Sequence, residues 1–404
     1  MGACLLYIAN RFDNYLLSYR SKLCNNEVSS IAGLSKRVFV RSGLFPQPSL
    51  APFTTTLEQD TIIRAAYHGG TSFLINHYAK DVFSFDINSL YPFLKIQPLY
   101  IGKPTYVPAE KLPPYQIRGF LGLVCATVTV PEELPHPLLL RSLYQDGERR
   151  SKIGQGTFTG LFYAEELDYA LTLGYTCEVL YGLQFTRKEV TKTFVDHFYA
   201  LKQSQTNDPA QRQLTKLFLN SLFGKLSQKP LETQSYNELV RAFAVYSGNV
   251  TARARILKHK VIKAFPNLIS YSDTDSIYLN KDLRLLSTSE KTILCKALGL
   301  NELVGPRLGS FKKETFSTEA FFFAPKRYLL RSEHNHFTFK AAGLNQSYYN
   351  QPHSFKFLPI YTPSSIHLSP FPPSSTYDPQ LSIDHFALSS TTTLFLSPLQ
   401  ITSR

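Results

Sequence analysis

The sequence predicts an α+β fold from three observations: a β-hairpin, an alternating strand and a long helical stretch, each in a separate part of the chain. Apolar residues at 268–269 and 277–279 flank a polar turn at 271–276, which is typical of a β-hairpin. Residues 82–87 alternate so that one face of the strand is apolar throughout. Residues 187–226 are the most helical part of the chain. Hairpin strands together with separate helices indicate the α+β class.

The composition is that of a large globular protein with a polyanionic partner. At 404 residues, with 43% hydrophobic and 13% aromatic residues, the chain can bury a large core in two or more lobes. Its formal charge of +13 favours nucleic acid over a membrane as the partner. The ionic residues from Gln351 onward cancel, so the excess charge belongs to residues 1–350.

Cysteine usage and hydropathy exclude several protein classes. Five scattered cysteines without a C-x-x-C pair argue against a zinc ribbon or a secreted disulfide framework and favour a reducing compartment. No apolar run approaches the roughly 20 residues that are needed to span a bilayer. We therefore expect no membrane partner.

The first informative signals lie in residues 67–92. Tyr67-His68-Gly69-Gly70 predicts a loop whose glycine pair lets the backbone approach a ligand closely, although alone it is only a turn. Asp86 stands at the end of the alternating strand, where the chain turns before Pro92. Taken alone, Asp86 is interpreted as a residue that caps this turn.

Residues 99–181 are predicted to be rich in strands. Prolines punctuate short apolar runs between residues 99 and 150. Residues 165–173 look helical, and residues 177–181 resemble a strand. The glycines at 154–156 lack the Lys and Ser/Thr of a phosphate-binding P-loop, so we interpret them as a turn.

A helix is predicted to start at Asp208-Pro209, which supply a cap and a first-turn proline. Leucines and Phe218 cover one side of this helix. Its opposite face collects two cations, an amide and an aromatic ring, from Arg212, Lys216, Asn220 and Phe223. Such a helix either grips a phosphate-bearing ligand or exposes an ordinary polar face to solvent.

Basic residues gather again between residues 251 and 263 and near residue 326. Thr251 to Arg255 begins a basic helical stretch that either follows a sugar-phosphate backbone or is simply solvated. Lys326-Arg327-Tyr328 mixes basic and aromatic residues. From about Ser347 the chain is rich in Ser, Thr and Pro, and we expect a poorly packed tail.

The hairpin turn carries two carboxylates, Asp273 and Asp275, which point to the same side of an extended chain. Like charges this close repel each other, so the arrangement is costly unless a cation lies beside them. The alternatives are an ordinary solvated turn and one half of a divalent-metal site.

Six of these stretches, in this order, resemble the motifs of family B DNA polymerases, specifically of the protein-primed branch found in phages and organellar linear plasmids. The matches are Tyr67 to Gly70 with Y-x-G-G, Asp86 to Pro92 with D-x-x-S-L-Y-P, Lys216 to Gly224 with K-x-x-x-N-S-x-Y-G, Thr251 to Arg255 with T-x-x-A-R, Tyr271 to Ser276 with Y-x-D-T-D-S, and Lys326 to Tyr328 with K-x-Y. Each motif is weak alone, but their conjunction favours the functional alternative for each stretch.

The resemblance implies a right-hand polymerase with an antiparallel-sheet palm and helical fingers, which adds deoxynucleotides to a primer. Asp86 and Asp275 would hold two Mg²⁺ ions with Asp273 in support, because magnesium needs few protein carboxylates beside water and phosphate. These three aspartates are the expected catalytic residues. The implied partners are primer–template DNA, dNTPs and a possible terminal protein that primes synthesis.

The resemblance also assigns roles to the other motif residues. Lys216, Asn220 and Arg212 would contact the triphosphate of the incoming nucleotide. Tyr91 would reject a 2′-hydroxyl. Phe223, where the family has Tyr, would pack beside the new base pair with altered nucleotide discrimination. Contacts with DNA are expected from the remaining motif residues, namely Tyr67, Gly69, Gly70, Thr251, Arg255, Lys326 and Tyr328.

The same resemblance divides the chain into segments and implies that the exonuclease domain and the thumb are incomplete. Residues 9–17 resemble only the second of three acidic exonuclease motifs. The expected segments are an exonuclease remnant at 1–66, a palm with an insertion at 67–186, fingers at 187–247, the rest of the palm at 248–345 and a Ser/Pro-rich tail at 346–404.

Two alternatives stand beside an active DNA polymerase. Lost flanking domains favour a polymerase-like remnant that binds DNA or a terminal protein without catalysis. A reverse transcriptase or RNA polymerase palm is disfavoured, because the turn reads Asp-Thr-Asp instead of Asp-Asp and because Tyr91 is in the position that excludes ribose. The branch implies a mitochondrial location, with the gene in the organelle or on a plasmid.

We predict that the protein lacks 3′–5′ exonuclease activity, because residues 1–66 contain neither the D-x-E motif nor the third motif and are too few for a complete exonuclease domain. End-labelled single-stranded DNA incubated with the protein and Mg²⁺ should keep its length on a denaturing gel. Shortening from the 3′ end that Asp13→Ala abolishes would contradict this prediction.

Overall fold

The computed structural model describes residues 31–41, 44, 55–145, 148–205, 207–228 and 243–342. The chain divides into two compact units, residues 1–350 and 351–404, and every described residue lies in the first unit. The tail predicted at 346–404 and residues 1–30 of the predicted exonuclease remnant lie outside the described residues. Within the described ranges, no helix is long and apolar enough to cross a membrane.

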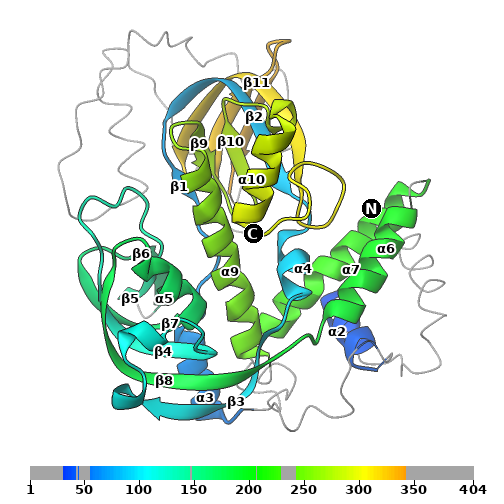
Figure 1. Ribbon diagram of the computed structural model, residues 1–404. Helices are drawn as coiled ribbons and strands as arrows, with labels where there is room; N and C mark the ends of the chain where they lie inside the picture. The colour runs from blue at the N-terminus through cyan, green and yellow to red at the C-terminus, as the bar shows by residue number, and fades with distance from the viewer. Residues whose placement is uncertain are drawn as a thin grey trace, which may run out of the picture. The chain divides into compact units, whose positions relative to one another are not determined.

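A seven-stranded antiparallel sheet contains the strand patterns seen in the sequence (Figure 1). Its strand order is β1-β9-β10-β2-β11-β12-β13. The strands are β1 (Phe73–Leu74), β2 (Tyr78–Ile87), β9 (Ile269–Ser272), β10 (Ser276–Leu279), β11 (Phe311–Ala324), β12 (Arg327–Arg331) and β13 (Phe337–Ala341). The predicted hairpin is β9 and β10, and the predicted alternating strand is the second half of β2.

Residues of β2 contribute to two separate apolar clusters. Phe85 and Ile87 belong to the main apolar core, which the helices also line. Val82 points into a smaller, largely aromatic cluster on the other face. The other buried members of that cluster are Tyr271, Tyr278, Ala320, Phe322, Tyr328 and Leu330.

The β-rich region between residues 99 and 188 forms a second antiparallel sheet, in the order β3-β8-β4-β7. Its strands are β3 (Leu99–Pro108), β4 (Gly122–Thr129), β7 (Thr157–Tyr163) and β8 (Thr176–Lys188). A separate hairpin, β5 (Leu140–Gln145) and β6 (Glu148–Ile153), pairs only with itself in the described part of the chain. Helix α5 (Ala164–Leu171) follows β7 directly, as the helical pattern near residue 165 predicted.

The helical region predicted at 187–226 is two helices that follow the end of β8. They are α6 (Lys192–Ser204) and α7 (Pro209–Ser227). Asp208 caps α7, since its carboxylate accepts a hydrogen bond from the Gln211 N–H at 3.0 Å. Phe218 and Leu222 are buried as predicted, whereas Leu217 is 43% exposed. The other helices are α2 (Ile31–Arg41), α3 (Leu57–Ala65), α4 (Leu90–Lys95), α9 (Ala244–Ala264) and α10 (Thr288–Leu298).

Helix α9 is the central support of the described unit. It contacts α3, α4, α5, α7, α10 and β3, and most of its residues are buried. The basic stretch that begins at Thr251 lies in this helix. The two predicted alternatives were contact with a sugar-phosphate backbone and exposure to solvent, and neither holds for the whole stretch. Thr251, Arg255 and Lys258 are all buried, so they neither follow a nucleic-acid backbone nor face solvent.

Helix α2 packs against α7, although the sequence assigned residues 1–66 to a separate remnant. The Ser35 hydroxyl donates to the Phe218 carbonyl at 2.8 Å. The Phe39 ring is fully buried and stands edge-on to Phe194 and Phe243, with centroids 5.7 and 5.9 Å away. This helix is therefore part of the main core.

We predict that Lys95→Met stabilises the protein. Lys95 is fully buried, and its Nζ has no hydrogen-bond partner among the described residues. Burial lowers the pKa of Lys95 to about 7, against about 10.4 when unfolded. Between these values only the unfolded chain holds the proton, so the free energy of unfolding rises with pH. Lys95→Met should raise the free energy of unfolding by on the order of 3 kcal/mol at pH 7. The increase should be smaller towards pH 10, because there the unfolded chain also begins to lose the proton.

Chemical denaturation of both proteins from pH 6 to 10 measures this difference. Lys103→Met, at an exposed lysine of β3, is the matched control and should change little. A Lys95→Met variant no more stable than wild type at pH 7 would contradict the prediction.

Candidate active site

Two carboxylates from distant parts of the sequence meet where β2 and β10 run side by side. The register pairs Asp86 with Ser276, the residue after Asp275. The Ile87 N–H donates to the Asp275 carbonyl at 2.8 Å. The antiparallel pairing thus brings the end of the predicted strand against the predicted turn.

Ionisation of Asp86 and Asp275 is unfavourable in this environment. Burial raises the pKa of Asp86 to about 7, Asp275 and Glu314 add to the increase, and Lys216 and Lys312 oppose it. Burial also raises the pKa of Asp275, and Asp273 contributes in the same sense. Desolvated like charges of this kind are relieved by a proton or by a cation.

Asp273 is in a different state from its neighbour. Its Oδ1 accepts hydrogen bonds from the Ser72 hydroxyl at 2.7 Å and the Thr274 N–H at 2.8 Å, and lies 3.3 Å from Lys326 Nζ. Although burial acts to raise the pKa of Asp273, these contacts outweigh it, so the pKa lies below its usual value. The side chain is therefore a fixed, ionised group.

The donor set suits magnesium better than a metal that needs an all-protein cage. In the described residues, no group of three or more His, Cys, Asp or Glu side chains has the geometry of a metal centre. Two desolvated carboxylates still fit Mg²⁺, which keeps several waters and is completed by substrate phosphates. Asp86 and Asp275 therefore fit the Mg²⁺ ions that the sequence implied.

Cations from α6 and α7 gather beside the carboxylates. Arg212, Lys216 and Asn220 are exposed on α7, and Lys216 is close enough to act on Asp86. Lys202 of α6 is buried, and its Nζ donates to the Ser89 hydroxyl at 3.3 Å. Burial lowers the pKa of Lys202 to about 8, and repulsion from Arg212, Lys216 and Lys312 adds to this effect. The cluster is suited to a polyanionic ligand.

Tyr91 of α4 packs against Phe223 of α7, and Asp275 is close enough to act on the Tyr91 hydroxyl. The two ring centroids lie 4.5 Å apart. Burial raises the pKa of Tyr91 to about 12, and Tyr67 and Asp275 act in the same direction. The structure thus brings together the tyrosine expected to exclude ribose, the phenylalanine of α7 and the turn.

The loop at Tyr67 to Gly70 abuts the turn. Gly69 is exposed, and a Cβ added there would meet nothing within 4 Å. A Cβ added at Gly70 would meet Thr274 Cγ2 at 2.7 Å, so a larger residue would force the Thr274 side chain to move. Ser72, two residues further along, holds Asp273. One end of the loop is therefore attached to the carboxylate turn.

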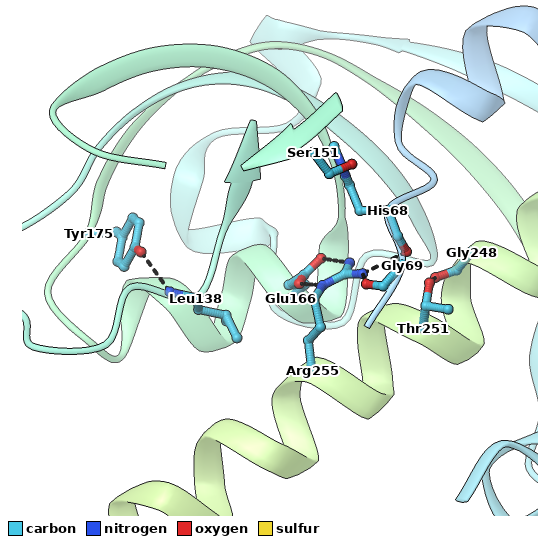
Figure 2. A network of polar contacts seen from close by, with 9 residues as sticks. All are labelled: His68, Gly69, Leu138, Ser151, Glu166, Tyr175, Gly248, Thr251 and Arg255. Atoms are coloured by element: carbon cyan, nitrogen blue, oxygen red, sulfur yellow. Dashed lines mark hydrogen bonds and ion pairs between the residues drawn. The ribbon is translucent and has the colours of Figure 1, made fainter. Parts of the chain in front are cut away.

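Arg255 attaches the other end of the loop, as Figure 2 shows. Its side chain is 1% exposed and forms two hydrogen bonds with Glu166, at 2.6 and 2.7 Å. Its Nη1 donates to the carbonyls of His68 and Gly69, both at 2.8 Å. The predicted contact of Arg255 with DNA is therefore wrong, because its donors are enclosed and used within the protein.

The predicted contacts of Thr251 and Tyr328 with DNA are also wrong, because both side chains are buried. The Thr251 hydroxyl is buried and donates to the Gly248 carbonyl at 2.9 Å. Tyr328 is 5% exposed, and its hydroxyl pairs with that of Tyr278 at 2.6 Å. Neither side chain can reach a nucleic acid from these positions. Lys326, in contrast, has a side chain that is 54% exposed beside Asp273.

Sequence reasoning missed four residues of this arrangement: Ser72, Glu166, Lys202 and Glu314. Lys202 had a signal, since it continues the buried series of Phe194 and Phe198 at four-residue spacing. A lysine in such a series needs a polar partner or a ligand. Ser72, Glu166 and Glu314 had none, because only tertiary contacts bring them to the site.

Comparison with known proteins agrees with this arrangement. A family model described as DNA polymerase type B, organellar and viral, matches residues 5–241. A probable DNA polymerase of Ascobolus immersus is 26% identical in an alignment of 360 positions, which covers 78% of this chain and 28% of that protein. A probable DNA polymerase of Podospora anserina is 26% identical in an alignment of 393 positions, which covers 81% of this chain and 30% of that protein. The chain thus spans under a third of the length of these relatives.

A solved structure confirms the predicted fold class. Phi29 DNA polymerase, complexed with primer-template DNA and incoming nucleotide substrates, aligns with a TM-score of 0.62 and 22% sequence identity. The alignment covers 83% of this chain and 63% of that one. At this identity the likeness shows the fold alone. Since the family model covers more than half of its residues, the chain belongs to the organellar and viral type B DNA polymerases.

Proposed function

We propose that the protein is a template-directed DNA polymerase that adds deoxynucleotides to a primer 3′-hydroxyl. The observation that carries this proposal is the desolvated pair Asp86 and Asp275 beside the cations of α6 and α7. A site that combines desolvated carboxylates with a cation cluster suits a metal-bound triphosphate.

Asp86 and Asp275 would hold two Mg²⁺ ions, which when bound activate the attacking hydroxyl and stabilise the leaving oxygen. Asp273, fixed by its hydrogen bonds, orients the turn that carries Asp275. Lys216, Arg212 and Asn220 bind and orient the triphosphate, and Lys202 joins them. In phosphoryl transfer, such positioning and charge neutralisation supply most of the catalysis.

The remaining exposed residues provide the nucleic-acid contacts. Gly69 and Gly70 let the backbone of a DNA strand approach the loop, and Tyr67 belongs to the same contact. Lys326 offers an exposed ammonium to the primer terminus beside Asp273. The DNA partner accords with the DNA in the phi29 polymerase structure.

The proposal includes priming by a terminal protein and a mitochondrial location on organellar or plasmid DNA. Organellar and viral membership supports the location. In the proposed division, residues 67–186 and 248–345 form the palm, with the second sheet as its insertion, and residues 187–247 form the fingers. The protein of the alternative hypothesis binds DNA or a terminal protein without catalysis.

We predict primer extension that depends on both carboxylates. Purified protein with primed template, dNTPs and Mg²⁺ should lengthen the primer. Asp86→Asn and Asp275→Asn should each lower the rate by about a hundredfold or more, because each removes charge that holds the metals and the transition state in place.

Asp196→Asn is the matched control, since Asp196 is half exposed and paired only with Lys192 on α6 in the described residues. It should extend primers like wild type, and gel shifts should show that all variants bind DNA. Extension that is absent in wild type, or that persists in both active-site variants, would favour the non-catalytic alternative.

We predict that Tyr91→Val relaxes the exclusion of ribonucleotides, because it removes the ring that packs on Phe223 at the proposed sugar position. The ratio of kcat/KM for dNTP to that for the matching rNTP should fall roughly tenfold or more. Single-nucleotide extension kinetics measure both constants. An unchanged ratio, with extension intact, would show that Tyr91 does not contact the sugar.

A further inference from the structure

Lys258 occupies an unusual position beneath the carboxylate turn. It lies on α9, and the whole residue is 4% exposed. Its Nζ donates to the main-chain carbonyl of Asp273 at 3.0 Å. The ammonium also lies 5.4 Å from the centroid of the Phe73 ring, on β1. A buried cation thus touches the backbone of the turn from the side of the protein interior.

The charges that act on Lys258 come from the proposed site. Asp273 and Asp275 favour its protonated form, whereas Lys326 and Arg255 oppose it. Burial opposes that form more strongly and lowers the pKa of Lys258. A buried ammonium is costly to keep, and an apolar side chain of similar length would fill the space at lower cost. What Lys258 adds beyond packing is a donor for Asp273 and, in its protonated form, a positive charge near two carboxylates.

We propose that Lys258 is the positioning residue of the Asp273–Asp275 turn, whose backbone it fixes from inside while its ammonium shares the charge of the carboxylates with a bound divalent cation. This inference rests on the proposed function, since it assumes that Asp275 holds such a cation. Three contacts then fix Asp273 from separate elements: Ser72 from the loop, Lys326 from the β11–β12 turn and Lys258 from α9.

Two opposite effects follow from removing this side chain. Loss of the ammonium leaves the carboxylates more negative, so a divalent cation binds more tightly. Loss of the hydrogen bond frees the turn, so Asp275 is less well placed and the chemical step slows. A residue that serves packing alone would produce neither tighter metal binding nor this split between affinity and rate.

The experiment compares Lys258→Met, which removes charge and donor, with Lys258→Arg, which keeps both. Lys263→Met, at an exposed lysine on the same helix, changes the net charge equally and is the control. Binding of Mn²⁺ to each protein without DNA is followed by the paramagnetic signal of the free ion. Primer extension then gives kcat and the Mg²⁺ concentration for half-maximal rate.

We expect the dissociation constant of Lys258→Met for Mn²⁺ to fall roughly three- to tenfold. Its kcat should fall roughly tenfold or more. Lys258→Arg should keep the wild-type affinity within about twofold. Asp275→Asn should weaken binding of Mn²⁺, which shows that the measured ion occupies the turn.

Unchanged or weaker Mn²⁺ binding by folded Lys258→Met would overturn the inference, as would an equal shift in Lys263→Met. If Lys258→Met does not fold in a thermal melt, Lys258→Gln, which is also neutral, takes its place. Wild-type protein that binds Mn²⁺ but extends no primer would contradict the proposed function, and the binding comparison would still decide the role of Lys258. Wild-type protein that binds no Mn²⁺ at this turn would overturn both.

Discussion

The repulsion between Asp86 and Asp275 is the constraint on which the rest of this structure depends. Each carboxylate is desolvated, and each is brought to the other by ordinary antiparallel pairing of β2 with β10. A folded chain keeps such a pair only if the surrounding scaffold holds it. The scaffold here includes a sheet whose strands contribute to two apolar clusters, and helix α9, which is buried. It also includes the loop that contacts the turn at Gly70 and Ser72.

Charge is used in two different ways around this pair. On the side of α6 and α7, burial together with repulsion from Arg212, Lys216 and Lys312 lowers the pKa of Lys202, so this cluster of cations attracts an anionic ligand. On the side of α9, charge is compensated internally, as in the pairing of Arg255 with Glu166. A buried ion pair of this kind adds little net stability, but it fixes direction, and here it fixes the backbone of the loop.

Local patterns in the sequence predicted the elements that carry the site. The hairpin, the strand that ends at Asp86 and the cap at Asp208 all follow from short-range rules of alternation and turn chemistry. The same rules failed for Arg255, because its partner Glu166 is 89 residues away and a charge pattern does not reveal whether a carboxylate covers it. Tyr328 failed for a related reason: an aromatic residue beside basic ones resembles a surface contact until the sheet buries it. Lys202 was missed although its spacing placed it on a buried stripe.

The close approach of Gly70 to Thr274 couples the residues that are tolerated at two positions 204 residues apart in the sequence. A methyl group gained at residue 70 overlaps the Thr274 side chain, so either that side chain must move or a smaller residue must replace it. A substitution at residue 70 is therefore accommodated more easily after a smaller residue has replaced Thr274. Fewer substitutions are therefore tolerated at residue 70 than its exposure to solvent suggests.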